Sequence, residues 1–417
     1  MKISRCKLCA ATKLLAGAWL FAAMAAAQDF TQRGFLETRH TFYPQTAPND
    51  SGQYVGEALF RWEATKRYFQ NLRINVGFDA RTDSHRQVSR EWEVNFSDRG
   101  LQRPALSIRR ASISYTRGNF TVEAGKQFIR WGKADILNPT DRFAPRDFLN
   151  VFDNEFLAVP AVRGSWDNGK TSVDLVWQLR FTPSRTPLLN QRWTVVPEQS
   201  RGVPITDLGL QVPGGTQFGA RVNHIGRGYE ASVSFYDGNN HLPTIDGAPI
   251  LNPPSVGIHR VYPQLRFYGG DAAVPLKWFT IKAESGYYTS TDSRADNFLL
   301  YVIQLERQFG EWSLVGGYAG EVVTERRTDL NFAPDRGIAK AFLGRASYTI
   351  DVNRSVAIET AIRETGAGAI VRFEYSQALG QNWRVTVGGN LIRGKADDFL
   401  GQYRRNSNGL VAIRYSF

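Results

Sequence analysis

Histidine and cysteine, two side chains that often catalyse a reaction or bind a metal, are scarce in this sequence. It has five histidines and two cysteines, and both cysteines lie within the first nine residues. No two histidines are within five residues of each other, so no pair has the spacing of a zinc site. A phospholipase site built on β-strands needs an Asn, a His and a Ser side chain together. The only candidates for such a set are Asn223 and His224 with Ser232 or Ser234. Strand alternation puts His224 on the face opposite Asn223, so we expect no enzyme, no metal and no cofactor.

Charged side chains recur instead on one face of alternating segments. In the segment 54–64, Glu57, Arg61 and Glu63 share one strand face, and aromatic and small side chains share the other. In a water-filled barrel such charges form cross-strand ion pairs, and those at the narrowest level set ion preference. The polar face that we expect to line a lumen, with basic groups slightly in excess, includes Arg61, Arg73, Arg81, Arg221, Arg266, Glu284, Arg345, Arg372 and Arg384.

The densest polar and aromatic stretch begins at 125–141 and continues as a loop over 130–160. At about thirty residues it is longer than a hairpin needs, and such loops are usually functional or disordered. Its aromatics, among them Trp131, Phe143 and Phe148, need a dry surface, which argues against disorder. An outer lid and a fold into the lumen both remain open, and we favour the inward fold.

The charges of this loop are then the candidates for a pore constriction. We expect Arg142 and Arg146 to face acidic wall residues across a narrow opening, where the field of a charge is focused. The full set of constriction candidates is Arg130, Lys133, Asp135, Asp141, Arg142, Arg146 and Asp147.

Amphipathic strands must position these groups. Each is about nine to twelve residues long, which is the length of a tilted transmembrane strand. Two kinds of connection alternate between them. Short ones, most with Gly, Asn or Asp, fall at 66–70, 118–119, 167–169, 226–228, 272–276, 310, 351–353 and 380–382. The others, mostly longer and polar, fall at 43–52, 82–104, 130–160, 182–215, 238–260, 289–297, 325–338, 366 and 394–409. This predicts about 18 strands, with 16 as the alternative, short periplasmic turns and long extracellular loops.

The two ends of the sequence predict export and assembly. Residues 1–27 have a basic start, an apolar run and a small-residue cleavage site, which is typical of a cleaved signal peptide. The barrel domain then spans 28–417. Tyr415 and Phe417 end an amphipathic strand of the kind that the barrel-assembly machinery reads. We therefore expect a bacterial outer-membrane location, with lipid and lipopolysaccharide as neighbours and without nucleic acid, despite the net charge of +12.

The run Gly-Lys-Gln…Trp-Gly-Lys-Ala-Asp…Asn-Pro-Thr-Asp at 125–141 resembles a family of poorly characterised bacterial outer-membrane β-barrels. Some members of that family are associated with inner-membrane exporters of lipid or hydrophobic solutes, and others have porin-like roles. The likeness extends to 262–266 and 309–320. The resemblance implies transport or a structural barrel, and it supplies no catalytic residues.

These observations predict an all-β protein, a single antiparallel transmembrane β-barrel. The favoured function is a porin-like channel for small solutes. A slightly basic lumen favours anionic solutes among them. Three alternatives remain. An export conduit for hydrophobic or polysaccharide cargo would have an inner-membrane exporter as partner, a cytochrome sheath would have a multihaem partner, and an enzyme barrel would depend on His224.

Overall fold

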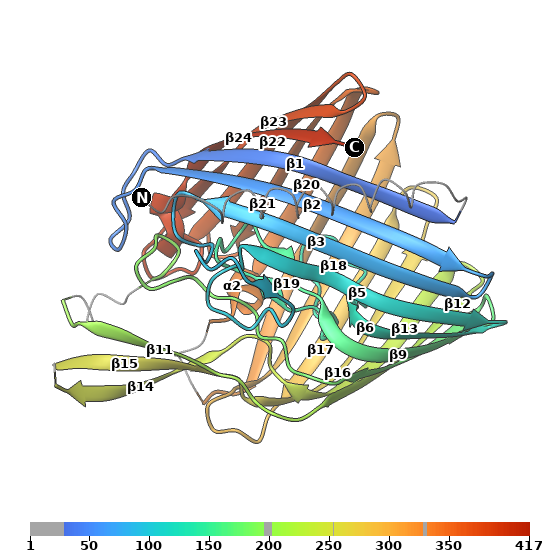
Figure 1. The fold of residues 1–417 in the computed structure, drawn as a ribbon, viewed down its shortest axis with the longest axis horizontal. Helices are drawn as coiled ribbons and strands as arrows, with labels where there is room; N and C mark the ends of the chain where they lie inside the picture. The colour runs from blue at the N-terminus through green and yellow to red at the C-terminus, as the bar shows by residue number, and fades with distance from the viewer. Residues whose placement is uncertain (1–28, 196–201, 253, 328–331) are drawn as a thin grey trace, which may run out of the picture.

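A closed β-barrel dominates the structure, a computed structural model that describes residues 29–195, 202–252, 254–327 and 332–417. The expected leader, 1–27, lies outside the described residues. In this part of the chain 18 antiparallel strands close into one barrel, as predicted (Figure 1). No helix among the described residues is long and apolar enough to cross a membrane.

Each barrel strand pairs with the next one along the chain, and the last pairs with the first. The strands are β1 (Phe30–Phe42), β2 (Tyr54–Tyr68), β3 (Leu72–Asp83), β5 (Leu106–Arg117), β6 (Phe120–Gln127), β9 (Val159–Asp167), β10 (Thr171–Gln178), β12 (Gln217–Gly226), β13 (Tyr229–Asn239), β16 (Gln264–Pro275), β17 (Thr280–Thr289), β18 (Asn297–Phe309), β19 (Trp312–Glu325), β20 (Ala341–Asp351), β21 (Arg354–Arg363), β22 (Gly368–Leu379), β23 (Trp383–Gly394) and β24 (Asn408–Ser416). Because β24 pairs with β1, the barrel has no unpaired edge strand.

The connections divide between the two ends as the turn chemistry predicts. At one end every connection is short, and glycines with positive φ, such as Gly118 at 59° and Gly228 at 82°, make several of the turns. The β16–β17 turn lies at 276–279, four residues later than the sequence suggested. All the longer connections meet at the other end (Figure 1).

Side chains alternate between an outward apolar face and an inward face. On β18, Ile303 and Leu305 are 51% and 47% exposed, whereas the intervening Gln304 is 4% exposed. Large apolar side chains exposed in rows around a barrel are typical of contact with lipid. Aromatic rings such as Phe120, Trp312 and Trp383 begin strands at the short-turn end, where a membrane interface would lie.

Phe417 completes the closure of the barrel. Its backbone N–H donates to the carbonyl of Gly34, and its own carbonyl accepts from the N–H of Gly34, each at 2.9 Å. Its ring stacks on Phe60 of β2 at 6.1 Å, and Tyr415 contacts Trp383 of β23 at 5.0 Å. The final aromatics therefore join the last strand to both of its neighbours.

The long-loop end holds structure that the sequence did not predict. Strands β11 (Ile205–Gln211), β15 (Pro254–Val261) and β14 (Thr244–Leu251) form a separate sheet that projects from the barrel (Figure 1). The other short elements at this end are β4 (Val94–Asn95), the pair β7 (Arg146–Asp147) and β8 (Glu155–Phe156), helix α2 (Pro334–Ile338) and the 3₁₀ turn η2 (Gly401–Asn406).

Candidate functional site in the lumen

The connection between β6 and β9, residues 128–158, lies inside the barrel and is called the inserted segment below. Phe143 is 1% exposed, and its ring packs edge-on against Trp131 at 5.3 Å and against Tyr236 of β13 at 5.1 Å. Further along, Phe152 packs against Tyr403 at 5.5 Å. The dry surface that these aromatics require is thus supplied by the inner wall and by other loops.

Glu284 of β17 is the main wall anchor of the inserted segment. Its Oε2 accepts the backbone N–H groups of Lys133 and Ala134, each at 3.0 Å. Its Oε1 accepts the N–H of Thr140 at 2.7 Å and the Thr140 hydroxyl at 2.8 Å. Four donors around one buried carboxylate fix the conformation of the segment over 133–140.

Lys133 and Asp135 extend this anchor to neighbouring strands. The Lys133 ammonium lies 2.7 Å from Glu230 and 3.0 Å from Asp271, and it also donates to Asn223 at 3.0 Å. Asp135 accepts from Lys282 at 3.3 Å through its carboxylate, and its backbone N–H donates to Gln304 at 3.1 Å. The first half of the segment therefore binds the wall from β12 to β18.

Glu155 binds the other side of the wall. Its carboxylate lies 3.1 Å from Arg61 on β2 and 2.6 Å from Arg81 on β3. Both arginines also bind the buried Asp79, at 2.8 and 2.9 Å. Burial alone would raise the pKa of Glu155, but Arg81 and Arg61 hold it well below its usual range. The segment is therefore tied to two separate parts of the barrel.

Asp147 links the inserted segment to two other loops. Arg103, from the β3–β5 connection, donates to it at 3.0 and 3.2 Å, and Arg185, from the β10–β12 connection, donates at 3.1 Å. Arg185 also binds Asp98 at 2.7 Å. Burial opposes ionisation, but Arg103 and Arg185 lower the pKa of Asp147 to about 2.

Asp141 braces the segment internally. Its Oδ1 accepts the N–H groups of Trp131 and Gly132, each at 2.7 Å, and its Oδ2 lies 3.3 Å from Arg130. The Arg130 guanidinium lies over the Phe156 ring at 4.1 Å. The side chain of Arg130 is nevertheless 46% exposed, and that of Asp135 is 30% exposed. These are the candidates that most face open space.

Among the residues that the structure describes, neither Arg142 nor Arg146 has the acidic wall partner that we expected. Arg142 lies over the rings of Tyr288 at 4.9 Å and Phe267 at 5.6 Å. Arg146 lies over Phe156 at 4.3 Å and donates to Asn154 at 3.2 Å. For Arg142, wall aromatics take the place of carboxylates, because the loop covers this part of the inner face and makes it dry. Arg146 instead contacts a ring and an amide of the inserted segment itself.

Most of the expected lumen arginines lie on the inward face. Arg221 binds Asp271 at 2.8 Å, Arg372 donates to the Phe152 carbonyl of the inserted segment at 2.6 Å, and Arg384 donates to Ser376 at 3.1 Å. By strand alternation, Arg73 lies on the same face as Asp79, and Arg345 lies on the same face as the buried Leu343.

The prediction for Arg266 is wrong. Its neighbours Leu265 and Phe267 are the buried, inward residues of β16, so Arg266 faces outward and pairs with Asp237 at 2.8 Å. At this part of β16 the apolar side chains point inward and the polar ones outward, because the inserted segment supplies an apolar surface within the lumen. The alternation of β16 alone could not reveal that surface.

Asn223 and His224, the weak enzyme candidate, lie on opposite faces. Asn223 binds Lys133 in the lumen, whereas His224 contacts the Thr171 hydroxyl at 2.8 Å on the outward face. Across the described residues, no three His, Cys, Asp or Glu side chains are grouped as a metal site.

Sequence reasoning missed the charged residues of the other loops. Asp98, Arg103 and Arg185 form the network around Asp147, and Lys126 at the end of β6 joins it through Asp98. They come from separate connections, and no local pattern distinguishes them from solvated loop charges. Glu155 lies within the predicted loop, but its neighbours gave no reason to select it.

Comparisons with known proteins identify the fold. No protein-family model and no curated protein matches the sequence. Solved structures do match. Acinetobacter baumannii OccAB3 has a TM-score of 0.54 at 9% identity, over 94% of this chain and 100% of that chain. A BenF-like porin from Pseudomonas fluorescens has a TM-score of 0.55 at 7% identity, over 93% of this chain and 97% of that chain.

The chain shares the closed antiparallel β-barrel fold of these structures. At such low identity the likeness extends to the fold and not to residues or substrates.

Proposed function

We propose that this protein is a channel of the bacterial outer membrane that passes small polar solutes, and that the inserted segment forms its constriction. The outward rows of exposed apolar side chains suit a lipid bilayer. The observation that supports the constriction best is that the segment binds opposite parts of the wall, through Glu284 on β17 and through Arg81 on β3.

An anionic solute is the class that the exposed lumen charges favour. On the inward face, Arg73 and Arg384 near the short-turn end and Arg345 in the middle of β20 are exposed, as is the carboxylate of Glu374. The carboxylates Asp79, Asp271 and Glu284 are buried against cations or loop N–H donors. A cation that lacks a close carboxylate leaves a positive potential in a narrow, low-dielectric passage.

The charged lumen also weighs against an export conduit for hydrophobic cargo. A hydrophobic cargo needs an apolar path, because desolvating charged wall groups costs free energy. The inner wall instead holds charges on many strands, among them Arg61, Arg221 and Arg372. The resemblance of 125–141 to exporter-associated barrels therefore supports, in our proposal, shared barrel architecture and not shared cargo.

Purified protein reconstituted in planar bilayers tests the proposal. We expect discrete single-channel currents and, in a salt gradient, a reversal potential that indicates anion preference. Replacing Arg73, Arg345 and Arg384 together by Gln should shift that potential toward zero. Absence of current from correctly folded barrels would reject the channel, and cation preference would reject the anionic solute.

A further inference from the structure

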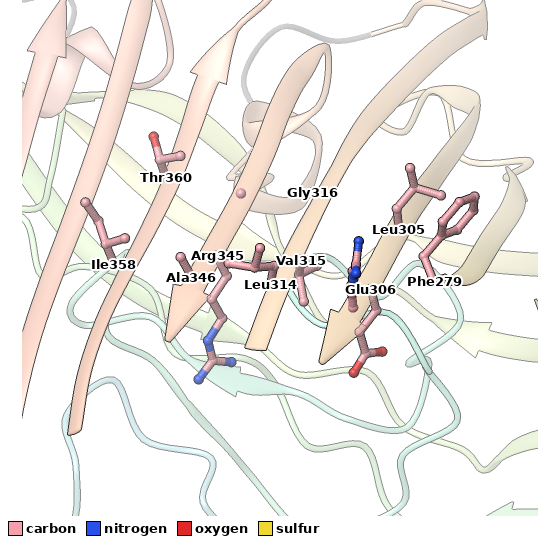
Figure 2. A pocket seen from close by; sticks show the side chains of 12 residues that line it. Phe279, Leu305, Glu306, Leu314, Val315, Gly316, Arg345, Ala346, Ile358 and Thr360 are labelled. Carbon is pink, nitrogen blue, oxygen red and sulfur yellow. The ribbon is translucent and has the colours of Figure 1, made fainter. Parts of the chain in front are cut away.

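An apolar groove lies on the outward face of β18 to β21. Its volume is about 490 Å³, and Gly316 of β19 and Gly344 of β20 are paired side by side within it. Leu305 of β18 and Ile358 of β21 flank the two glycines, and Figure 2 shows these side chains on either side. The groove exists because two adjacent strands lack side chains at the same level of the wall.

Aromatic pairs bound the groove along the strands. Toward the short-turn end, Trp312 contacts Tyr348 with ring centroids 4.8 Å apart. Toward the long-loop end, Tyr318 contacts Phe342 at 5.5 Å. In both cases the rings continue the outward rows that contain Gly316 and Gly344. The depression therefore has defined ends and is not a continuous furrow.

Two cations lie at the short-turn end of this surface. Arg307 lines the groove, and its guanidinium lies 5.5 Å from the Trp278 ring centroid and 5.3 Å from that of Phe309. Lys277 lies 5.3 Å from the same Trp278 ring. Neither cation forms an ion pair with any residue that the structure describes. The surface thus combines an apolar groove with unpaired positive charge beside an aromatic ring.

We propose that this groove binds one anionic phospholipid of the periplasmic leaflet. One acyl chain lies between Leu305 and Ile358 over the two glycines, and the phosphate lies against Arg307 and Lys277. Water cannot fill a groove in the lipid-facing wall. An acyl chain in the groove makes the dispersion contacts that the two glycines, having no side chains, do not make. Basic side chains beside tryptophan at the membrane interface attract anionic headgroups.

Native mass spectrometry in mild detergent tests this site, independently of any channel activity. The protein is mixed with equal amounts of phosphatidylglycerol and phosphatidylethanolamine that have identical acyl chains. We expect one phosphatidylglycerol to be retained in preference. Arg307→Gln should reduce that preference about fivefold, because each basic group near the surface favours an anionic lipid by roughly this factor. Gly316→Phe should abolish retention of both lipids.

Gly316→Phe is expected to fold, since a Cβ at Gly316 meets no heavy atom within 4 Å. Gly164→Phe is its control, at an equally open outward position on β9. Arg227→Gln, in the β12–β13 turn, is the control for charge. Equal retention of the two lipids by the unmodified protein, or equal losses in the controls, would overturn the proposal. So would a protein oligomer that Gly316→Phe dissociates, because the groove would then be a contact between copies.

Discussion

Glu284 is the residue on which the inward position of the inserted segment depends most. Its carboxylate accepts four hydrogen bonds from the segment, including three backbone N–H groups. In Glu284→Gln an amide NH₂ replaces one acceptor and faces those donors. Leaving buried donors unsatisfied costs about 1 to 3 kcal/mol each. We therefore expect faster proteolysis within 128–158 and flickering single-channel currents.

Glu374→Gln is the matched control for this change. Glu374 lies on the inward face of β22 but is exposed. Its replacement should leave the proteolysis of 128–158 unchanged and the currents free of flickering. If Glu284→Gln and Glu374→Gln behave alike, the carboxylate of Glu284 does not hold the segment.

Asp147 makes the loop network sensitive to acid. Its pKa is lowered from 3.8 to about 2 by Arg103 and Arg185, so its ionised form favours the folded loops. The stabilisation is present above about pH 4 and is lost as the pH falls toward 2, because the unfolded carboxyl binds a proton first. Proteolysis of 128–158 by an acid-active protease should accelerate over this interval. In Asp147→Asn it should be fast throughout, and an unchanged pH profile in that variant would contradict the assignment.

At the scale of the element, β24 depends on its final residue. Phe417 forms two backbone hydrogen bonds with Gly34 and stacks on Phe60, so it joins β24 to β1 and β2. We expect Phe417→Ala to lower the yield of heat-modifiable barrel in outer membranes several-fold. Phe120→Ala removes another exposed outward ring, one that takes no part in closure. Equal yields from the two variants would show that closure does not require the Phe417 ring.

The strands and turns were predictable because each follows from a local rule. Alternation identifies a strand, and Gly118 or Gly228 identifies a turn. The sheet of β11, β14 and β15 was not predicted, since β11 pairs with β15 across about fifty residues of chain and neither alternates clearly. The outward position of Arg266 was missed for a related reason. It depends on what the inserted segment covers, and that is a contact between distant parts of the chain.

The candidate site was also predictable only in part. The length and aromatics of 130–160 indicated a folded loop, and its inward position was one of two open alternatives. The wall partners could not be derived, because which arginine meets Glu155 or Asp147 depends on how the barrel curves around the segment. Arg142 shows the limit most clearly, since an aromatic partner and an acidic one are equally compatible with its sequence context.

At the scale of the whole molecule, a closed barrel surrounds a segment that binds its wall on opposite sides. Gln127 and Val159 are paired neighbours on β6 and β9, so a short Gly-Ser turn can replace residues 130–156 without breaking the barrel. Heat-modifiable migration of this variant would verify that its barrel is closed.

The single-channel conductance of this shortened variant tests the central claim most directly. If the inserted segment forms the constriction, removing it should raise the conductance several-fold over that of the unmodified protein and weaken the ion selectivity. A folded variant with unchanged conductance and selectivity would place the constriction elsewhere and contradict this account.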